Sequence, residues 1–167
     1  MTLSFIIRKY QDDDRGQCRA LWRELTEWHR EIYQDSTIGG QHPEDYFDKH
    51  LATVGPDQIW VVVCDSEVVG LIGLVVKGEE AEIEPLVVSK AYRRKGIGTK
   101  LIETTVSEAR KKGVKFLEIK PVARNANAIR FLYRQGFQNL GHIDLFMDFS
   151  NHPWKPGLEI FGCKFDY

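Results

Sequence analysis

A basic, glycine-rich stretch lies near the middle of the chain, between an apolar run and a run with helical spacing. Residues 93–98 read Arg-Arg-Lys-Gly-Ile-Gly, and the apolar run before them ends at Leu86–Val88. The N–H groups at the start of a helix bind anions, and glycine allows a phosphate to approach the backbone because it has no Cβ. These residues predict a binding loop for a pyrophosphate group. The alternative is an ordinary turn in which glycine permits close packing.

Two commoner phosphate-binding patterns do not fit this stretch. A P-loop ends in Gly-Lys-Ser or Gly-Lys-Thr, and the chain has neither sequence here. The dinucleotide-binding pattern GxGxxG needs a glycine at position 101, where the chain has Leu101. The stretch therefore belongs to neither class.

Two carboxylates precede the same turn. Glu82 and Glu84 alternate within residues 81–86, so a strand would place both on one face. Pro85 has no N–H to donate to a sheet, and we therefore expect a bulge or local splaying there. A carboxylate beside splayed backbone can act as a general base, and the alternative is a solvated strand face. Glu118, in the strand-like run 116–120, is a third candidate.

Hydrophobic spacing predicts the elements that position these groups. Runs with strand character are 3–9, Ile59–Asp65, Val68–Val76, Glu80–Val88, Val114–Ile119 and Phe137–Phe149. Helical runs are roughly 13–33, one opened by His42-Pro43-Glu44, Thr99–Lys112 closed by Gly113, and about 125–134 closed by Gly136. This order predicts an α+β domain with a mixed sheet. We expect a single domain over 1–167, with its core at about 3–149 and a C-terminal extension, 150–167, that adds one more strand.

The composition is that of a globular protein and argues against two classes of partner. The 167 residues are 43% hydrophobic and carry a net charge of −1, without the basic bias of general nucleic-acid binding. No apolar run approaches the ~20 residues of a membrane span, and the N-terminus lacks the layout of a signal peptide. We therefore expect a cytoplasmic protein with no nucleic-acid or membrane partner.

The three cysteines, Cys18, Cys64 and Cys163, lie far apart in the sequence. Their spacing from one another and from histidines is not typical of a zinc site. Cys18 and Cys64 fall in apolar runs, so we interpret them as small buried hydrophobic residues. No metal is expected.

Two segments resemble the GNAT N-acetyltransferase superfamily. Arg93-x-x-Gly96-x-Gly98, after a strand ending at Leu86–Val88, resembles the signature motif of that family. Residues 125–137 resemble its Asn-x-x-Ala…Phe…Gly-Phe helix, and the element order agrees from about residue 3 to 149. The resemblance implies the GNAT fold, with a splayed fourth strand in a mixed sheet and helices on both faces. It also implies an enzyme that moves the acetyl group of acetyl-CoA to a primary amine by direct attack in a ternary complex.

The resemblance also implies which residues bind the cofactor. The strand before the loop would pair with the pantetheine arm, the loop would surround the pyrophosphate, and the later helix would pack nearby. These residues are Leu86, Val87, Val88, Arg93, Arg94, Lys95, Gly96, Ile97, Gly98, Thr99, Asn125, Ala128 and Phe131. Asn125 has a plain alternative role as the N-cap of its helix.

The implied reaction needs a base and an acid. An alkyl amine has a pKa near ~10 and must lose a proton before it attacks. The family often uses an acidic residue on the splayed strand, so Glu84 is the first candidate and Glu82 the second. A backbone N–H near Leu86 or Val87 would stabilise the oxyanion. Many relatives have a tyrosine where this chain has Leu132; Tyr133 is one residue later, a rotation of about 100° on a helix. Tyr133 or water would therefore protonate the thiolate.

The acceptor is the least constrained part of this hypothesis. In this family the first two helices recognise it, which makes Trp28, Tyr33 and Asp35 candidates, with core packing as the alternative for the aromatic rings. A small-molecule amine and a protein amine both fit. Two alternative functions are transfer from another acyl-CoA and a non-catalytic CoA-binding sensor. The apolar tail Trp154–Phe165 also allows a homodimer through an edge strand, and the alternative is that it folds back on its own sheet.

Overall fold

The computed structural model describes residues 4–167, which form two compact units that meet between Lys120 and Pro121 in the sequence. Each unit is described by itself. The predicted first strand, 3–9, is observed as β1, Ile6–Lys9, and residue 3 lies outside the described residues. The single domain over 1–167 stays a prediction.

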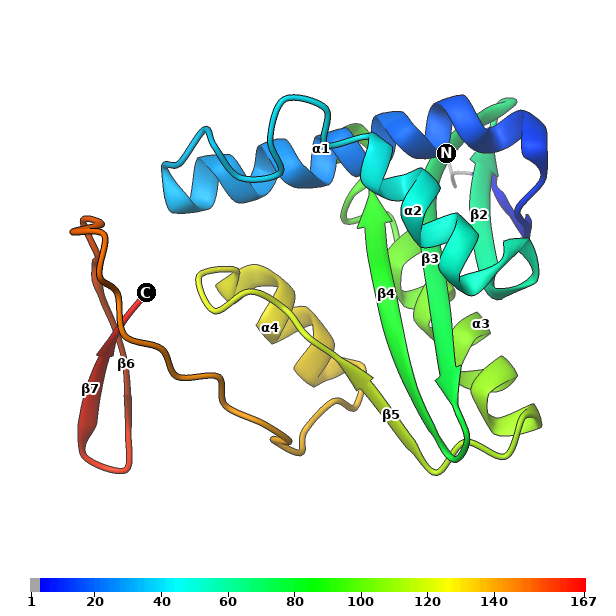
Figure 1. The fold of residues 1–167 in the computed structure, drawn as a ribbon. Helices are drawn as coiled ribbons and strands as arrows, with labels where there is room; N and C mark the ends of the chain where they lie inside the picture. Colours follow the sequence, from blue (N-terminus) through cyan, green and yellow to red (C-terminus); the bar gives the residue numbers. More distant parts are fainter. Residues whose placement is uncertain (1–3) are drawn as a thin grey trace. The chain divides into compact units, whose positions relative to one another are not determined.

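The N-terminal unit contains a five-stranded sheet in the order β1-β2-β3-β4-β5 (Figure 1). Its strands after β1 are β2 Ile59–Cys64, β3 Glu67–Lys77, β4 Glu80–Val88 and β5 Phe116–Ile119. Neighbours are antiparallel except β4 and β5, which are parallel and joined through a helix. The predicted mixed sheet and α+β class are confirmed.

Three helices cover the two faces of this sheet (Figure 1). They are α1 Arg15–Tyr33, α2 Asp45–Val54 and α3 Ile97–Lys111, with short 3-10 turns at Asp12–Asp14, Pro56–Gln58 and Lys90–Tyr92. Successive residues of β3 face opposite sides. A Cβ on Gly70 would lie 3.5 Å from Leu101 of α3, whereas Leu71 packs in the cluster beneath α1 and α2.

The core beneath α1 and α2 consists of apolar side chains at helical and strand spacing. Cys18, Phe47 and Leu71 have no exposed surface. Burial raises the pKa of the Cys18 thiol to about 12, so this cysteine is protonated and behaves as a small hydrophobic residue. Cys64 is buried as well. The interpretation of both cysteines is confirmed.

Strand β4 changes register at Pro85, as predicted. Ile72 of β3 pairs with Leu86, and Leu74 pairs with Ile83. Gly73 therefore lies opposite two residues, Glu84 and Pro85, which is the arrangement of a bulge. The parallel pairing of β4 with β5 covers Glu80–Ile83 and does not continue into the described part of β4 beyond the bulge. The second half of β4 thus splays away from β5.

The C-terminal unit contains the helix α4, Ala126–Arg134, and a hairpin of β6, Pro156–Ile160, and β7, Cys163–Asp166. Phe161 and Gly162 connect the two strands with positive φ angles of 53° and 76°, as in a tight hairpin turn. The prediction of one further strand in 150–167 was therefore wrong, because this turn folds the tail into two strands.

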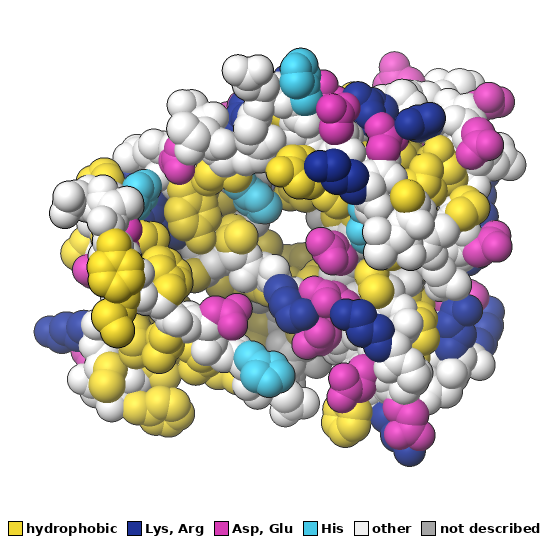
Figure 2. Space-filling model, viewed as in Figure 1, with side chains coloured by type: hydrophobic (Ala, Val, Ile, Leu, Met, Phe, Trp, Pro, Cys, Tyr) yellow, Lys and Arg dark blue, Asp and Glu magenta, His cyan; other side chains and the backbone are white. Residues whose placement is uncertain are grey.

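The prediction of strand structure in Phe137–Phe149 was also wrong. No residue of this segment forms a strand. Asp148 instead accepts hydrogen bonds from the hydroxyl and the backbone N–H of Ser150, from the Trp154 indole and from the His152 N–H, and these bonds lower the pKa of Asp148. Such local bonding competes with a strand ladder. Figure 2 shows hydrophobic side chains gathered over this unit, and Leu145, for example, is 68% exposed.

The bulge requires a residue without a side chain at position 73. A Cβ on Gly73 would clash with the Glu84 carbonyl oxygen, so we expect Gly73→Ala to lower the free energy of unfolding by roughly 1–3 kcal/mol. Gly16→Ala is the matched control, because a Cβ there meets nothing within 4 Å and alanine favours a helix. Urea unfolding measures both. An unchanged stability of Gly73→Ala would contradict the close approach of β4 to Gly73.

Candidate functional site

The predicted phosphate-binding loop forms a compact turn between β4 and α3. Tyr92 donates its N–H to the Ser89 carbonyl at 2.8 Å. Arg94 and Gly96 then adopt left-handed φ angles of 61° and 82°. No side chain caps the start of α3 at Ile97, and the first N–H groups of a helix have no acceptor within it. This geometry directs backbone donors and the positive end of the helix dipole toward the turn.

The loop is attached to α1 through Glu24. Its Oε1 atom accepts a hydrogen bond from the Lys90 N–H at 2.5 Å and lies 3.5 Å from the Arg93 guanidinium. Arg93 also donates from Nε to the Val88 carbonyl at 2.9 Å, and its guanidinium lies 5.6 Å from the Trp28 ring centre. Arg93 therefore holds the loop in place, with Trp28 beside it.

Glu24 was not predicted as part of the site. It contacts Lys90, 66 positions later in the chain, and hydrophobic spacing carries no information about such a distant contact. The basic residues Arg94 and Lys95 of the loop are exposed. Lys95 Nζ lies 4.9 Å from the ring centre of Tyr92. These two side chains are the cations that the loop presents to solvent.

The splayed half of β4 supplies the remaining predicted groups of this unit. Val87 is buried in the core, whereas Leu86 and Val88 are half-buried. Ile97 is buried, and Gly98 and Thr99 are half-buried in the first turn of α3. Because β4 has no pairing with β5 in the described residues beyond Ile83, its backbone there can bond to an extended ligand.

The three candidate carboxylates have different surroundings. Lys120 Nζ lies 2.8 Å from Glu82 and 2.8 Å from Glu118, and the hydrogen bonds that it donates to Glu118 and Glu82 raise the pKa of Lys120. Glu84 is exposed at the bulge, and the described residues give it no ion pair. Among the three candidates, Glu84 is thus the carboxylate without an ion pair in the described residues, at the point where β4 splays away from β5.

His50 of α2 is a residue that the sequence reasoning missed. Its Nε2 atom is enclosed and makes no hydrogen bond within the described residues. Its ring centre lies 5.5 Å from that of Trp22, and a Cβ on Gly73 would lie 2.9 Å from Nε2. Burial lowers the pKa of His50, and the charge and backbone of Glu84 oppose this shift. The sequence signal that could have indicated a buried position for His50 is its spacing of three residues from the apolar Phe47 on a helix.

The predicted acceptor residues lie near the end of α1. Trp28 and Tyr33 are half-buried. Asp35 accepts hydrogen bonds from the Thr37 N–H at 2.8 Å and the Thr37 hydroxyl at 2.6 Å. It therefore stabilises the turn after α1, and a role toward an acceptor stays a prediction.

The remaining predicted residues belong to the C-terminal unit. Asn125 accepts a hydrogen bond from the Ala128 N–H at 3.1 Å, so its alternative role as an N-cap is confirmed. Phe131 is half-buried, Leu132 is buried, and Tyr133 is 59% exposed. The roles of Asn125, Ala128, Phe131 and Tyr133 toward a cofactor stay predictions.

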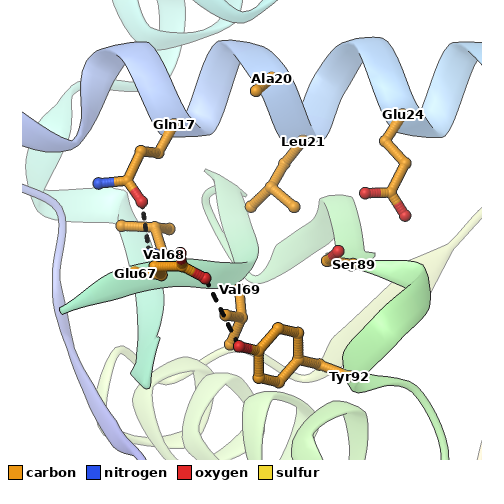
Figure 3. Close-up of a pocket in the computed structure, with 9 residues that line it drawn as sticks. All are labelled: Gln17, Ala20, Leu21, Glu24, Glu67, Val68, Val69, Ser89 and Tyr92. Atoms are coloured by element: carbon orange, nitrogen blue, oxygen red, sulfur yellow. Dashed lines mark hydrogen bonds between the residues drawn. The ribbon is translucent and has the colours of Figure 1, made fainter. Parts of the chain in front are cut away.

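A separate hollow of about 230 Å³ lies between α1, β3 and the turn after β4 (Figure 3). Gln17 closes one side by accepting the Val68 N–H at 2.7 Å, and the Tyr92 hydroxyl lies 3.5 Å from Glu67. Its lining residues are Gln17, Ala20, Leu21, Glu24, Glu67, Val68, Val69, Ser89 and Tyr92. None of these is a predicted cofactor or catalytic residue, so the hollow is distinct from the predicted site.

Two kinds of feature are absent from residues 4–167. No cluster of three or more His, Cys, Asp or Glu side chains there could hold a metal ion. Among the helices of the same residues, none is both long enough and apolar enough to cross a membrane.

Comparison with known proteins gives matches in sequence and in structure. An uncharacterized N-acetyltransferase of Methanocaldococcus jannaschii is 36% identical over 88 residues, which are 53% of this chain and 38% of that protein. This chain therefore spans well under half of that relative.

Two solved structures share the fold. An acetyltransferase of the GNAT family from Staphylococcus aureus superposes with a TM-score of 0.70 at 15% identity, over 89% of this chain and 93% of the other. The PaiA N-acetyltransferase of Thermoplasma acidophilum, solved in complex with coenzyme A, gives a TM-score of 0.67 at 22% identity, over 79% of this chain and 88% of the other.

The sequence model of the acetyltransferase (GNAT) family matches residues 16–137. This range begins in α1 and includes the sheet from β2 to β5, the glycine-rich loop and α4. The chain is therefore a member of the GNAT acetyltransferase family.

Proposed function

We propose that this protein transfers the acetyl group of acetyl-CoA to a primary amine by direct attack in a ternary complex. The observation that carries this proposal is that the glycine-rich loop directly follows the splayed half of β4. The loop suits a pyrophosphate, and the splayed strand suits an extended arm that bears amide groups. Family membership supports an acetyltransferase. The coenzyme A bound by the PaiA relative supports this donor.

In this proposal the chain holds the donor with backbone and cationic groups. The N–H groups of the loop and the first turn of α3 bind the pyrophosphate, and Arg94 and Lys95 add charge. Leu86, Val87 and Val88 bond to the pantetheine through their backbone. Arg93 keeps its contacts with Glu24 and Val88 and so preserves the shape of the loop.

Donor binding is tested by removing the two exposed cations. We expect the double substitution Arg94→Ala, Lys95→Ala to weaken coenzyme A binding roughly tenfold, because about 1.4 kcal/mol of charge-assisted bonding is lost. Lys100→Ala is the control, since Lys100 lies on α3 and pairs with Glu103. Isothermal titration calorimetry measures the three affinities. Equal affinities, or no binding by the unaltered protein, would contradict this donor site.

The proposed transfer begins when the acceptor amine loses a proton near the bulge. Glu84 supports this step, because it is the carboxylate without an ion pair there, whereas Glu82 is bound to Lys120. The nitrogen then attacks the thioester, and a backbone N–H near Leu86 or Val87 stabilises the oxyanion. Tyr133 or water protonates the departing thiolate.

The role of the carboxylate is tested by Glu84→Gln. We expect kcat at pH 7 to fall by about 10²-fold, the lower end of the usual effect of proton-transfer groups, while coenzyme A affinity stays the same. Glu80→Gln, at the exposed start of the same strand, is the control. Thiol release from acetyl-CoA with a panel of primary amines measures turnover. Unchanged turnover in Glu84→Gln would remove Glu84 from the mechanism.

A second candidate function is a non-catalytic sensor of coenzyme A. It is favoured by the apolar Leu132, which is buried where many relatives have a tyrosine. The sensor predicts thermal stabilisation by coenzyme A without turnover on any amine or with any acyl donor. The uncompensated Glu84 favours the enzyme. The acceptor class, a cytoplasmic location and a homodimer formed through Trp154–Phe165 stay proposals from the sequence.

A further inference from the structure

We propose that His50 and Glu84 act as a pair in the transfer. The His50 imidazole accepts the proton of the acceptor amine, and the Glu84 carboxylate stabilises the imidazolium that forms. This inference rests on the proposed acetyl transfer and adds a residue from α2 to its chemistry.

The bulge brings the two residues together. Gly73 has no side chain, and both the Glu84 carbonyl oxygen and His50 Nε2 lie over its Cα. Nε2 is enclosed and has no hydrogen-bond partner within the described residues, while the ring as a whole is half-buried. We assign the ring proton to Nε2, because this atom and the Glu84 carbonyl oxygen lie on the same side of Gly73, so that the Nδ1 lone pair is available for a proton.

The charges around His50 are few. The ring facing it from α1 is the uncharged Trp22, and β3 contributes Gly73. Several other charged groups on or beside α1, α2 and β4 form ion pairs with one another or with neighbouring segments; these are Arg15 and Arg19 with Asp48, Arg19 with Asp45, Arg23 with Glu44, and Glu82 with Lys120. Lys49 of α2 instead lies 4.7 Å from the ring centre of Tyr46. The carboxylate that raises the pKa of His50 against burial is that of Glu84.

An imidazole suits this step better than an isolated carboxylate. Burial lowers the pKa of His50 below its usual 6.5, so the ring is uncharged at neutral pH and can accept a proton. The unperturbed pKa of an imidazole, about 6.5, lies nearer neutral pH than that of an ordinary glutamate, about 4.3. General bases work best when their pKa lies near the working pH.

Each bond that forms in the proposed transfer is matched by a bond that breaks. An N–H bond of the acceptor ammonium breaks and an Nδ1–H bond forms on His50. The freed lone pair forms a bond to the thioester carbon, the C–S bond breaks, and its electron pair leaves on the coenzyme A sulfur. The second nitrogen proton passes to the thiolate or to solvent, and the imidazolium returns its proton to solvent.

The pair is tested by a double-mutant cycle. We expect His50→Gln to lower kcat by about 10²-fold, and the double variant with Glu84→Gln to be little worse than His50→Gln alone, because the residues act as a unit. His42→Gln is the control, since His42 is exposed and precedes the start of α2. Coenzyme A affinity, measured in every variant, should stay unchanged. Full turnover in His50→Gln, or losses that multiply, would overturn the pair.

The pH dependence separates this role from a structural one. The kcat/KM of the unaltered enzyme should fall in acid with a pKa below 6.5 that belongs to His50. In Glu84→Gln this acid limb should move to lower pH, because the carboxylate that raises the pKa is gone. In His50→Gln the limb should disappear. An acid limb that persists in His50→Gln would assign the proton acceptor to another group.

A measurement without turnover tests the same coupling. The ring protons of His50, assigned in the NMR spectrum by loss in His50→Gln, should titrate below pH 6.5 in the unaltered protein and lower still in Glu84→Gln. Identical titrations in the two proteins would overturn the pair even where turnover is found. If no amine is acetylated, the proposed function fails, and the titration still decides whether His50 and Glu84 interact.

Discussion

The site depends on a mismatch between two neighbouring strands. Between Ile72 and Leu74, β3 contributes one residue where β4 contributes two, and only a glycine at position 73 permits the Glu84 carbonyl to lie over it. This bulge re-aims the second half of β4, whose pairing with β5 covers only Glu80–Ile83. It also exposes Glu84 and brings its backbone to His50. The unpaired backbone, the carboxylate and the imidazole therefore share one structural cause.

A second set of contacts links this strand to the glycine-rich loop. The loop leaves β4 directly, and Arg93 bonds back to the Val88 carbonyl at the end of that strand. Glu24 of α1 holds both Lys90 and Arg93. The position of α1 on the sheet thus determines the position of the loop, because the same helix supplies Cys18 and Leu21 to the buried core. The hydrophobic core and the proposed donor site are therefore connected through α1.

Much of this could be predicted from local sequence patterns. The strand at Glu80–Val88, the bulge at Pro85, the loop at 93–98 and the α+β class follow from hydrophobic period, from the missing proline N–H and from glycine, all of which act within a few residues. The contacts of Glu24 with Lys90 and of His50 with Gly73 join distant residues, and no local pattern encodes them. The strand predicted in Phe137–Phe149 was wrong for a local reason: its residues favour a strand by composition, but at its end Asp148 binds N–H groups two and four residues later.

The central claim is that the donor bound at this loop gives its acetyl group to an amine. It is tested most directly by mixing the protein with acetyl-CoA labelled in the acetyl group and a panel of primary amines, and by analysing the products by mass spectrometry. We expect the label to appear on the nitrogen of at least one amine, with one free coenzyme A thiol for each amide formed. Coenzyme A binding without any labelled amide would contradict it.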